Sequence, residues 1–357
     1  MKVFYFFACK FTGAKFKKTR RIVHIVEGAD WVIKRIGGYI ARGVCVAGLD
    51  FISDVSSRFY VNSLIHFGSL HVFSGNIDNF THPSNKLIVT IFHGNWGISP
   101  EMDKSINKLI ASAGRISRVV VPNAIMKYRL ISWGIPEEKI AFIPIGVELK
   151  CFMPFSPDKK KALRNRFGIP ADAICIGSFQ KDGVGWGEGL EPKLIKGPDI
   201  FIKAVRLLSE KIKIYCLLTG PARGYIKKNL SISGIPYTYR FVEDYSEMAD
   251  FYNCLDLYLV TSREEGGPEA IMESMATGVP LVSTCVGMAP DLIRNKENGL
   301  LVGVDDIEGL AKSAKAIIGN NDLRSSLIKN GLETVKNYDW DIIAEKYALI
   351  YKKVLAE

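Results

Sequence analysis

The sequence predicts an α/β protein with two facing domains, each built on a doubly wound parallel sheet. Short apolar runs rich in Ile, Leu and Val alternate with amphipathic segments, which is typical of strand–helix units in a parallel sheet covered on both faces. The chain has 357 residues, enough for two domains of ordinary size. A proline-bearing segment at residues 144–157 separates two halves that repeat this alternation.

Apolar runs predict the strands, and the spacing of Ile33, Ile36 and Ile40 predicts a helix over residues 31–42. In the first half, strands are expected at residues 21–26, 43–47, 63–66, 86–92, 118–121 and 140–143. In the second half they are expected at residues 173–177, 213–219, 257–261 and 280–284, with helices near residues 198–209 and after Pro268. Ligands of such sheets bind at the carboxyl ends of the strands, so the motifs are expected in strand-to-helix loops.

Composition argues against several classes of protein. No apolar run approaches the roughly 18 residues that a membrane-spanning helix needs, and no segment has the pattern of a secretory signal. The seven cysteines are scattered singly, so neither a disulfide framework nor a zinc site is expected. We therefore expect a cytoplasmic protein, with a peripheral position on the inner face of the membrane as an open alternative.

The positive charge is confined to the first half. The net charge is +10, and residues 1–153 carry all of it. Residues 1–21 alone hold seven Lys or Arg, no acid and several interleaved Phe. This pattern suits an anionic membrane surface, where rings are buried and lysines meet headgroups, although a solvated tail would have the same composition. A nucleic-acid partner is not expected, because no binding motif accompanies the charge.

The most specific stretch, residues 261–280, reads TSREEGGPEAIMESMATGVP. Gly266 and Gly267 permit a tight turn and close approach of a ligand to the backbone. Pro268 suits the first position of a helix, whose unpaired N–H groups form a site for an anion or a hydroxyl. Glu269 and Glu273 are four residues apart and so share one helix face. A carboxylate there can accept two sugar hydroxyls.

A glycine-rich loop follows the expected strand at residues 173–177. It reads IGSFQKDGVGWGEG over residues 176–189 and ends in PKLIKG at residues 192–197. Lys181 and Lys196 are its candidate cations for a phosphate. The loop has neither the spacing of a P-loop nor that of the dinucleotide fingerprint, which argues against a nicotinamide dehydrogenase. Arg223, after the next expected strand, is expected at the surface, with a contact to the phosphates as the alternative.

Glu265 and Glu273 form an E-x7-E pattern followed by SMATGVP. With it, the chain strongly resembles the retaining glycosyltransferases of the GT-B fold, family 4 (glycosyl transferases group 1). The resemblance covers most of the chain and includes residues 143–154, 196–197, 285–293, 298–302 and 338–340. It implies Rossmann-like domains, here residues 1–153 and 154–337, and a C-terminal helix in residues 338–357 that crosses back to the first domain.

The resemblance also implies roles for the motif residues. Glu273 would hold the ribose hydroxyls of a nucleotide sugar, and Glu265 would contact hydroxyls of the transferred sugar. The turn of Gly266, Gly267, Pro268 and Glu269 would approach the sugar and phosphate. Lys196 matches a family lysine. Ser178 stands where the family has an arginine, and we assign the role of that arginine to Lys181.

Other matches are weaker. His93, in the stretch FHGNWG, matches a family histidine near the transferred sugar, although a structural role is equally compatible with the sequence; Asn95 would lie on the acceptor side. Gly28 would approach the diphosphate, where the family commonly has two glycines. Asp30 would cap a helix or meet the acceptor hydroxyl. Val242 and Glu243 stand where the family receives the base.

Together these features predict a retaining glycosyltransferase. It would move a sugar from a nucleotide-diphosphate sugar to a glycan or lipid-linked acceptor, in the synthesis of a cell-surface polysaccharide or lipopolysaccharide. The family needs no obligatory metal or cofactor, and we interpret the D-x-D pattern at Asp339 and Asp341 as a helix cap. The alternative is a non-catalytic subunit on the same fold that binds nucleotide or carbohydrate.

Overall fold

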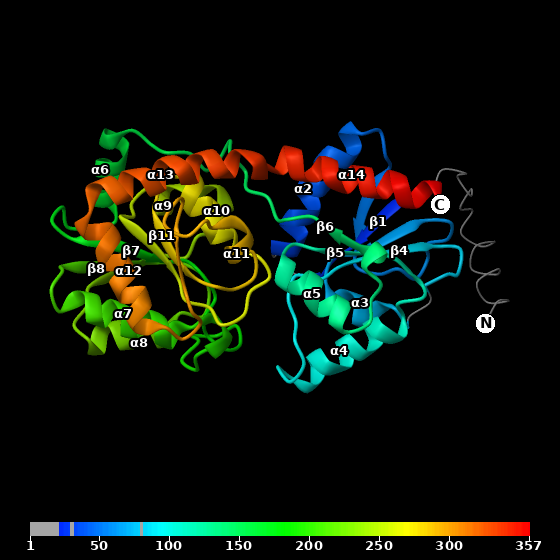
Figure 1. Ribbon diagram of the computed structural model, residues 1–357, viewed down its shortest axis with the longest axis horizontal. Helices are drawn as coiled ribbons and strands as arrows, with labels where there is room; N and C mark the ends of the chain where they lie inside the picture. The colour runs from blue at the N-terminus through cyan, green and yellow to red at the C-terminus, as the bar shows by residue number, and fades with distance from the viewer. Residues whose placement is uncertain (1–20, 29–31, 79–80) are drawn as a thin grey trace.

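The computed structural model describes residues 21–28, 32–78 and 81–357. These residues form two six-stranded sheets in which every strand pair is parallel, with helices packed on the sheets (Figure 1). The α/β fold with two parallel-sheet domains is therefore confirmed. Residues 1–20 of the basic segment and Asp30 lie outside the described residues.

The first sheet has the strand order β2-β1-β3-β4-β5-β6. Its strands are β1 (Ile22–Ile25), β2 (Phe51–Asp54), β3 (Leu64–Phe67), β4 (Lys86–Thr90), β5 (Ile116–Val121) and β6 (Ile140–Phe142). Its helices are α2 (Val32–Val46), α3 (Leu70–Asn76), α4 (Pro100–Ala111) and α5 (Ala124–Ser132). Strands β1, β3 and β4 are almost wholly buried, as expected for a parallel sheet covered on both faces.

The second sheet has the order β12-β11-β10-β7-β8-β9. Its strands are β7 (Ile174–Ser178), β8 (Ile214–Leu218), β9 (Tyr237–Tyr239), β10 (Leu257–Val260), β11 (Leu281–Thr284) and β12 (Leu300–Val302). The helices of this half are α6 (Pro157–Arg166), α7 (Pro198–Ser209), α8 (Gly224–Ile232), α9 (Met248–Tyr252), α10 (Glu269–Ala276), α11 (Ala289–Leu292), α12 (Ile307–Gly319) and α13 (Asn321–Val335). The final helix is α14 (Trp340–Ala356).

One predicted strand is wrong. Residues 43–47 fall in the last turn of α2 and just beyond it. Val44 continues the buried stripe of Ile36 and Ile40 at a spacing of four residues, so the helical period prevails over the β propensity of valine. A Cβ at Gly43 would overlap Ala344, and this close approach lets α14 pack against α2.

Helix α14 lies across the first domain (Figure 1). The Trp340 ring stacks on Tyr39 with the ring centroids 4.8 Å apart, and a Cβ at Gly146 would lie 2.8 Å from the same indole. The carboxylate of Asp339 accepts from the Asp341 amide, so Asp339 is the N-cap of α14. The segment that follows the second domain thus completes the core of the first domain.

Two buried histidines lie between α14 and the first sheet. Nδ1 of His66 lies 2.6 Å from the Tyr351 hydroxyl and Nε2 lies 2.7 Å from Thr90 Oγ1. The His24 ring centroid is 4.8 Å from that of His66, and His24 Nδ1 has no hydrogen-bond partner within the described part of the chain. Burial lowers the pKa of His24 to about 4, and burial lowers the pKa of His66 well below its usual value.

Within residues 21–28, 32–78 and 81–357, no helix is both long and apolar enough to cross a membrane.

The buried His24 predicts a loss of stability in mild acid. In the unfolded chain this histidine binds a proton near pH 6.5, whereas in the folded chain it does so only near pH 4. The unfolded state therefore holds more protons across that window, and stability falls as the pH is lowered through it. We expect His24 to contribute about 2 kcal/mol to the loss of unfolding free energy between pH 7.5 and pH 5.

Urea unfolding at the two pH values measures this loss. The H24N variant should lose less on acidification than the wild type. The matched control H71Q changes an exposed histidine on α3 and should lose as much as the wild type. Equal losses in H24N and H71Q would contradict the assignment.

Candidate functional site

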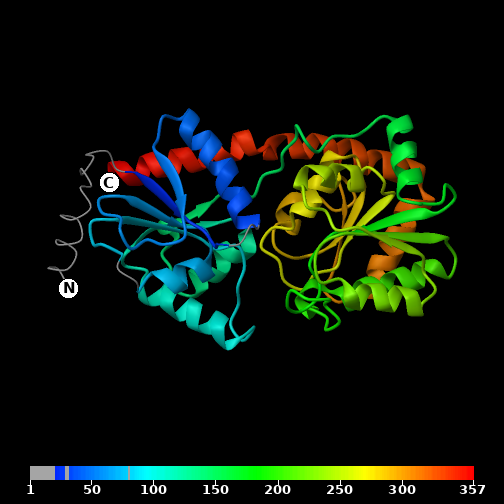
Figure 2. The same cartoon turned by 180° about the vertical axis from the view of Figure 1, so that it is seen from behind.

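The two domains meet through loops at the carboxyl ends of their strands. The loop after β4 contacts the loop after β10, because a Cβ at Gly266 would lie 2.6 Å from Phe92 Cβ. Beside it, the Asn123 amide, after β5, donates to the Gly266 carbonyl oxygen at 2.5 Å. Arg129 on α5 forms a two-pronged ion pair with Glu264 at 2.5 and 3.1 Å. Figure 2 shows this junction from behind, between the two sheets.

Glu265 and Lys196 form the centre of the site. Lys196 Nζ donates to Glu265 Oε1 at 2.7 Å, and the Ser262 hydroxyl donates to the same oxygen at 2.8 Å. Lys196 ends a short 3-10 helix, and Gly197 after it has φ of +63° with the Thr261 carbonyl where a Cβ would stand. Only glycine fits this turn. The sequence pair Lys196-Gly197 therefore places the ammonium group beside the loop after β10.

Lys193 is a third cation that the sequence analysis missed. Burial lowers the pKa of Lys193, and the nearby ammonium groups of Lys196 and Lys181 lower it further, against the opposing effect of Glu265. Desolvation also lowers the pKa of Lys181, whose Nζ lies 3.6 Å from the centroid of the Trp186 ring. Lys193 therefore lies close to both other lysines and to Glu265, and this group of ammonium charges suits a multiply charged anion.

His93 contributes from the first domain. It follows β4, and its ring is exposed to solvent. Desolvation by surrounding protein atoms and the Lys196 ammonium lower its pKa, while Glu265 and Glu264 act in the opposite direction. His93 is therefore neutral near pH 7. Asn95, on the same loop, is exposed, and its side-chain oxygen accepts from the Trp96 amide.

Glu273 and Glu269 lie on α10. Glu273 is 5% exposed, and its Oε2 accepts from the Tyr252 hydroxyl at 2.7 Å. Burial raises the pKa of Glu273 to about 7, although the Arg35 guanidinium opposes this. Arg35, from α2 of the first domain, donates to Glu269 at 2.5 Å and lies 3.4 Å from the centroid of the Tyr245 ring. An arginine of the first domain thus pairs with Glu269 and acts electrostatically on Glu273.

The turn before α10 differs from the expectation. The two glycines of this turn approach other parts of the protein closely. A Cβ at Gly266 would overlap Phe92, and a Cβ at Gly267 would overlap Ile145 and Met288. The helix predicted after Pro268 is present and begins at Glu269, but Pro268 is its N-cap residue and not its first helical residue. These glycines therefore bring the two domains together, and their missing side chains leave no gap of their own for a ligand.

The remaining predicted positions lie nearer the surface. Gly28 is exposed, and the position of its Cβ would be open. Glu243 is exposed, and Val242 is half-buried against the core. Asp30 lies outside the described residues.

Arg223 is buried, so the expectation of a surface residue is wrong. Only 1% of it is exposed. Its guanidinium donates to Ser178 Oγ at 2.8 Å and to the Gln180 carbonyl, and it lies 3.3 Å from Asp182. Burial raises the pKa of Asp182 to about 6, against the effect of Arg223. The arginine thus joins the end of β7 to the glycine-rich loop that carries Lys181.

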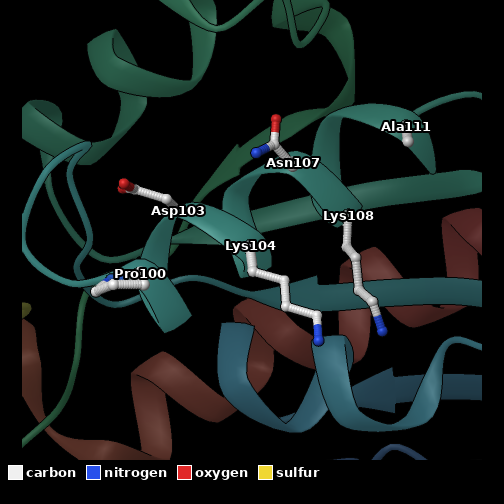
Figure 3. A pocket seen from close by; sticks show the side chains of 6 residues that line it. All are labelled: Pro100, Asp103, Lys104, Asn107, Lys108 and Ala111. Carbon is white, nitrogen blue, oxygen red and sulfur yellow. The ribbon is translucent and has the colours of Figure 1, made fainter.

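The pocket drawn in Figure 3 is separate from this site. It lies along one face of α4, and its lining residues are Pro100, Asp103, Lys104, Asn107, Lys108 and Ala111. None of the predicted site residues lines it.

Comparisons with known proteins show what this chain is similar to. The family model described as glycosyl transferases group 1 matches residues 190–334. The lipopolysaccharide core biosynthesis mannosyltransferase LpsB of Rhizobium meliloti is 25% identical over 74% of this chain and 70% of its own length. The glycosyltransferase LpsE of the same organism is 31% identical over 52% of this chain and 51% of its own length. The chain spans about half the length of several other curated relatives that it matches.

A solved structure extends the likeness to the fold of nearly the whole chain. Anabaena HepE, in complex with UDP and glucose, superimposes with a TM-score of 0.76 at 17% identity, over 94% of this chain and all of that chain. Residues 190–334 are thus similar to the group 1 glycosyl transferases, and the chain as a whole has the GT-B fold.

Proposed function

We propose that this chain is a retaining glycosyltransferase that uses a nucleotide-diphosphate sugar. The observation that carries the proposal is the Lys196–Glu265 ion pair, with Lys193 and Lys181 close enough to act on one another, at the carboxyl ends of β7 and β10. Its acceptor would be a glycan or a lipid-linked glycan of a surface polysaccharide or lipopolysaccharide. The names of the two Rhizobium relatives support this acceptor class.

The donor would lie along the carboxyl ends of the second sheet. Its diphosphate would lie against the three lysines, which supply the positive charge that two phosphates require. Its ribose hydroxyls would donate to Glu273, whose carboxylate is held by Tyr252. Glu265 would accept from hydroxyls of the transferred sugar. The UDP bound in the HepE structure supports a nucleoside diphosphate of this class.

The chemistry would depend on charge that grows at the departing diphosphate. Breaking the bond between the sugar and the phosphate places positive charge on the anomeric carbon and negative charge on the leaving oxygens. Fixed ammonium groups that are already in place stabilise this separation and lower the barrier. The acceptor oxygen would form its bond to the anomeric carbon on the face that the diphosphate leaves, which retains the configuration, and a departing phosphate oxygen would take the proton of that hydroxyl. His93, neutral near pH 7, would donate a hydrogen bond to the sugar.

Ligand binding tests the donor class. In a thermal-shift panel of UDP, GDP, ADP and their sugars, the true donor and its diphosphate should raise the melting temperature. At a concentration of 100 times Kd the stabilisation is about 2.7 kcal/mol, or several degrees for domains of this size. If none of these ligands shifts the melting temperature, the proposal fails. Binding without transfer to any acceptor would favour the non-catalytic subunit.

Substitution of the lysines tests their role. The K196A and K193A variants each remove a fixed positive charge beside the leaving group. Each should lower the transfer rate by about 10- to 100-fold, with a melting temperature close to that of the wild type. K203A is the matched control, because Lys203 is an exposed lysine on α7 and its loss should leave the rate unchanged. Wild-type rates in K196A and K193A would contradict the assignment.

The raised pKa of Glu273 predicts pH-dependent donor binding. Hydroxyl groups donate to the ionised carboxylate, and a pKa of about 7 means that this form grows from a minority at pH 6 to the majority at pH 8. The affinity for UDP should therefore rise about tenfold over this range. Calorimetry on the wild type and E273Q measures the effect. UDP ionises identically in both experiments, so a steep rise that persists in E273Q would assign it to the ligand or to another group.

A further inference from the structure

A second group of basic side chains lies at the amino ends of strands in the first sheet, which we call the amino edge of the sheet. A pocket of about 390 Å³ there is lined by four cationic side chains, Lys86, Arg115, Arg118 and Lys139. Lys86 begins β4, Arg115 immediately precedes β5, Arg118 lies early in β5 and Lys139 immediately precedes β6. All four therefore lie at the amino ends of neighbouring parallel strands. The loops of the donor site are at the carboxyl ends.

The cations of this pocket are held in place mainly by backbone oxygens. Lys139 Nζ donates to the Ala113 carbonyl at 2.7 Å, and Arg115 donates to the Thr81 carbonyl at 3.3 Å. Arg118 donates to the Ser117 carbonyl at 2.6 Å and pairs with Glu357, which is the one carboxylate in the pocket lining. Guanidinium and ammonium groups have more donors than these contacts use. The lining therefore keeps a net positive charge and spare donors, which suit a phosphate group.

The sequence is most basic just before β1. Residues 1–20 carry six Lys or Arg and no acid. Arg21, the residue before β1, lies at the amino edge too, because β1 runs parallel to β3, β4, β5 and β6. Figure 1 shows the C-terminal end of α14, with Glu357, at the end of the first domain farthest from the second domain.

An apolar side chain accompanies the charge. Phe59 is 80% exposed, and it precedes Tyr60, whose carbonyl accepts from Asn85 in the pocket lining. Aromatic residues beside clustered cations suit the interface of a phospholipid bilayer, where the ring enters the headgroup region and the cations meet phosphates. A free phosphate ion would make no favourable contact with the exposed ring.

We propose that this amino-edge pocket binds the phosphate headgroups of an anionic phospholipid surface. The first domain would then rest on the membrane by the edge that carries Lys86, Arg115, Arg118 and Lys139. The donor site would face away from the surface, with its loops free for nucleotide sugar. This inference stands independently of the proposed transferase activity, because none of the four cations belongs to the donor site.

Vesicle flotation with the full-length protein tests the proposal. We expect binding to phosphatidylcholine vesicles that contain about 30% phosphatidylglycerol, an anionic content that gives a strongly negative surface. We expect little binding to vesicles of phosphatidylcholine alone. The variant K86Q/R115Q/K139Q should bind the anionic vesicles at least about fivefold more weakly at low salt. Its UDP-induced thermal shift should match that of the wild type, which also shows that it is folded. The double variant K86Q/R115Q, which keeps the Lys139 contact to Ala113, should show a smaller loss of the same sign.

The matched control is K203Q/K312Q/K315Q, which removes the same charge from exposed positions on α7 and α12 of the second domain. It should bind vesicles nearly as the wild type does. The proposal is overturned if the wild type ignores anionic vesicles, if both triple variants lose binding equally, or if the pocket variant loses none. It is equally overturned if inorganic phosphate or RNA binds in a pocket-dependent way while vesicles do not, because the pocket would then serve a soluble anion.

Discussion

The close contact between Gly266 and Phe92 is the constraint on which the proposed donor site depends. A side chain at residue 266 would collide with the backbone of the loop after β4. Because residue 266 is glycine, the loop after β10 can reach the first domain and form its hydrogen bond with Asn123. Glu265 and Glu264, the preceding residues, then lie near His93 and Arg129. One missing side chain thus brings groups from two separate sheets into a single site.

Charge balance across this junction gives the site its character. Arg129 and Arg35 of the first domain neutralise Glu264 and Glu269 of the second. Glu265 pairs with Lys196 and also acts on Lys193. The acids at this junction thus have protein partners. Burial lowers the pKa of Lys193 and the ammonium groups of Lys196 and Lys181 lower it further, and an anionic ligand would relieve that repulsion.

The sequence predicted the central strands well and the edge strands poorly. Strands such as β3, β4 and β10 are buried on both faces, so their residues form continuous apolar runs. The strands that the analysis missed, β2, β9 and β12, lie at sheet edges and are short and partly exposed. Edge strands have less burial to mark them. The end of α2 was predicted as a strand because local propensity does not reveal tertiary packing. Gly43 packs against α14, and Val44 packs against the sheet.

For the site, local motifs carried most of what could be predicted. Glu265, Glu273 and Lys196 stand in short patterns with recognisable spacing, and the structure brings Glu265 and Lys196 into contact. Arg35 and Tyr252 could not be predicted, because each meets its carboxylate only after distant segments fold together. Arg223 is buried, although arginine is usually exposed. Its buried partners, Asp182 and Ser178, lie some forty residues earlier in the sequence.

The position of α14 has a consequence for biosynthesis. Helix α14 comes last in the order of the described elements, yet it packs against α2 in the first domain. Its Tyr351 hydroxyl also forms a hydrogen bond with His66. Domains commonly fold in order as they emerge from the ribosome. In this chain the packing of the first domain against α14 cannot form until residues 340–356 have been made, although the sheet of that domain is synthesised first.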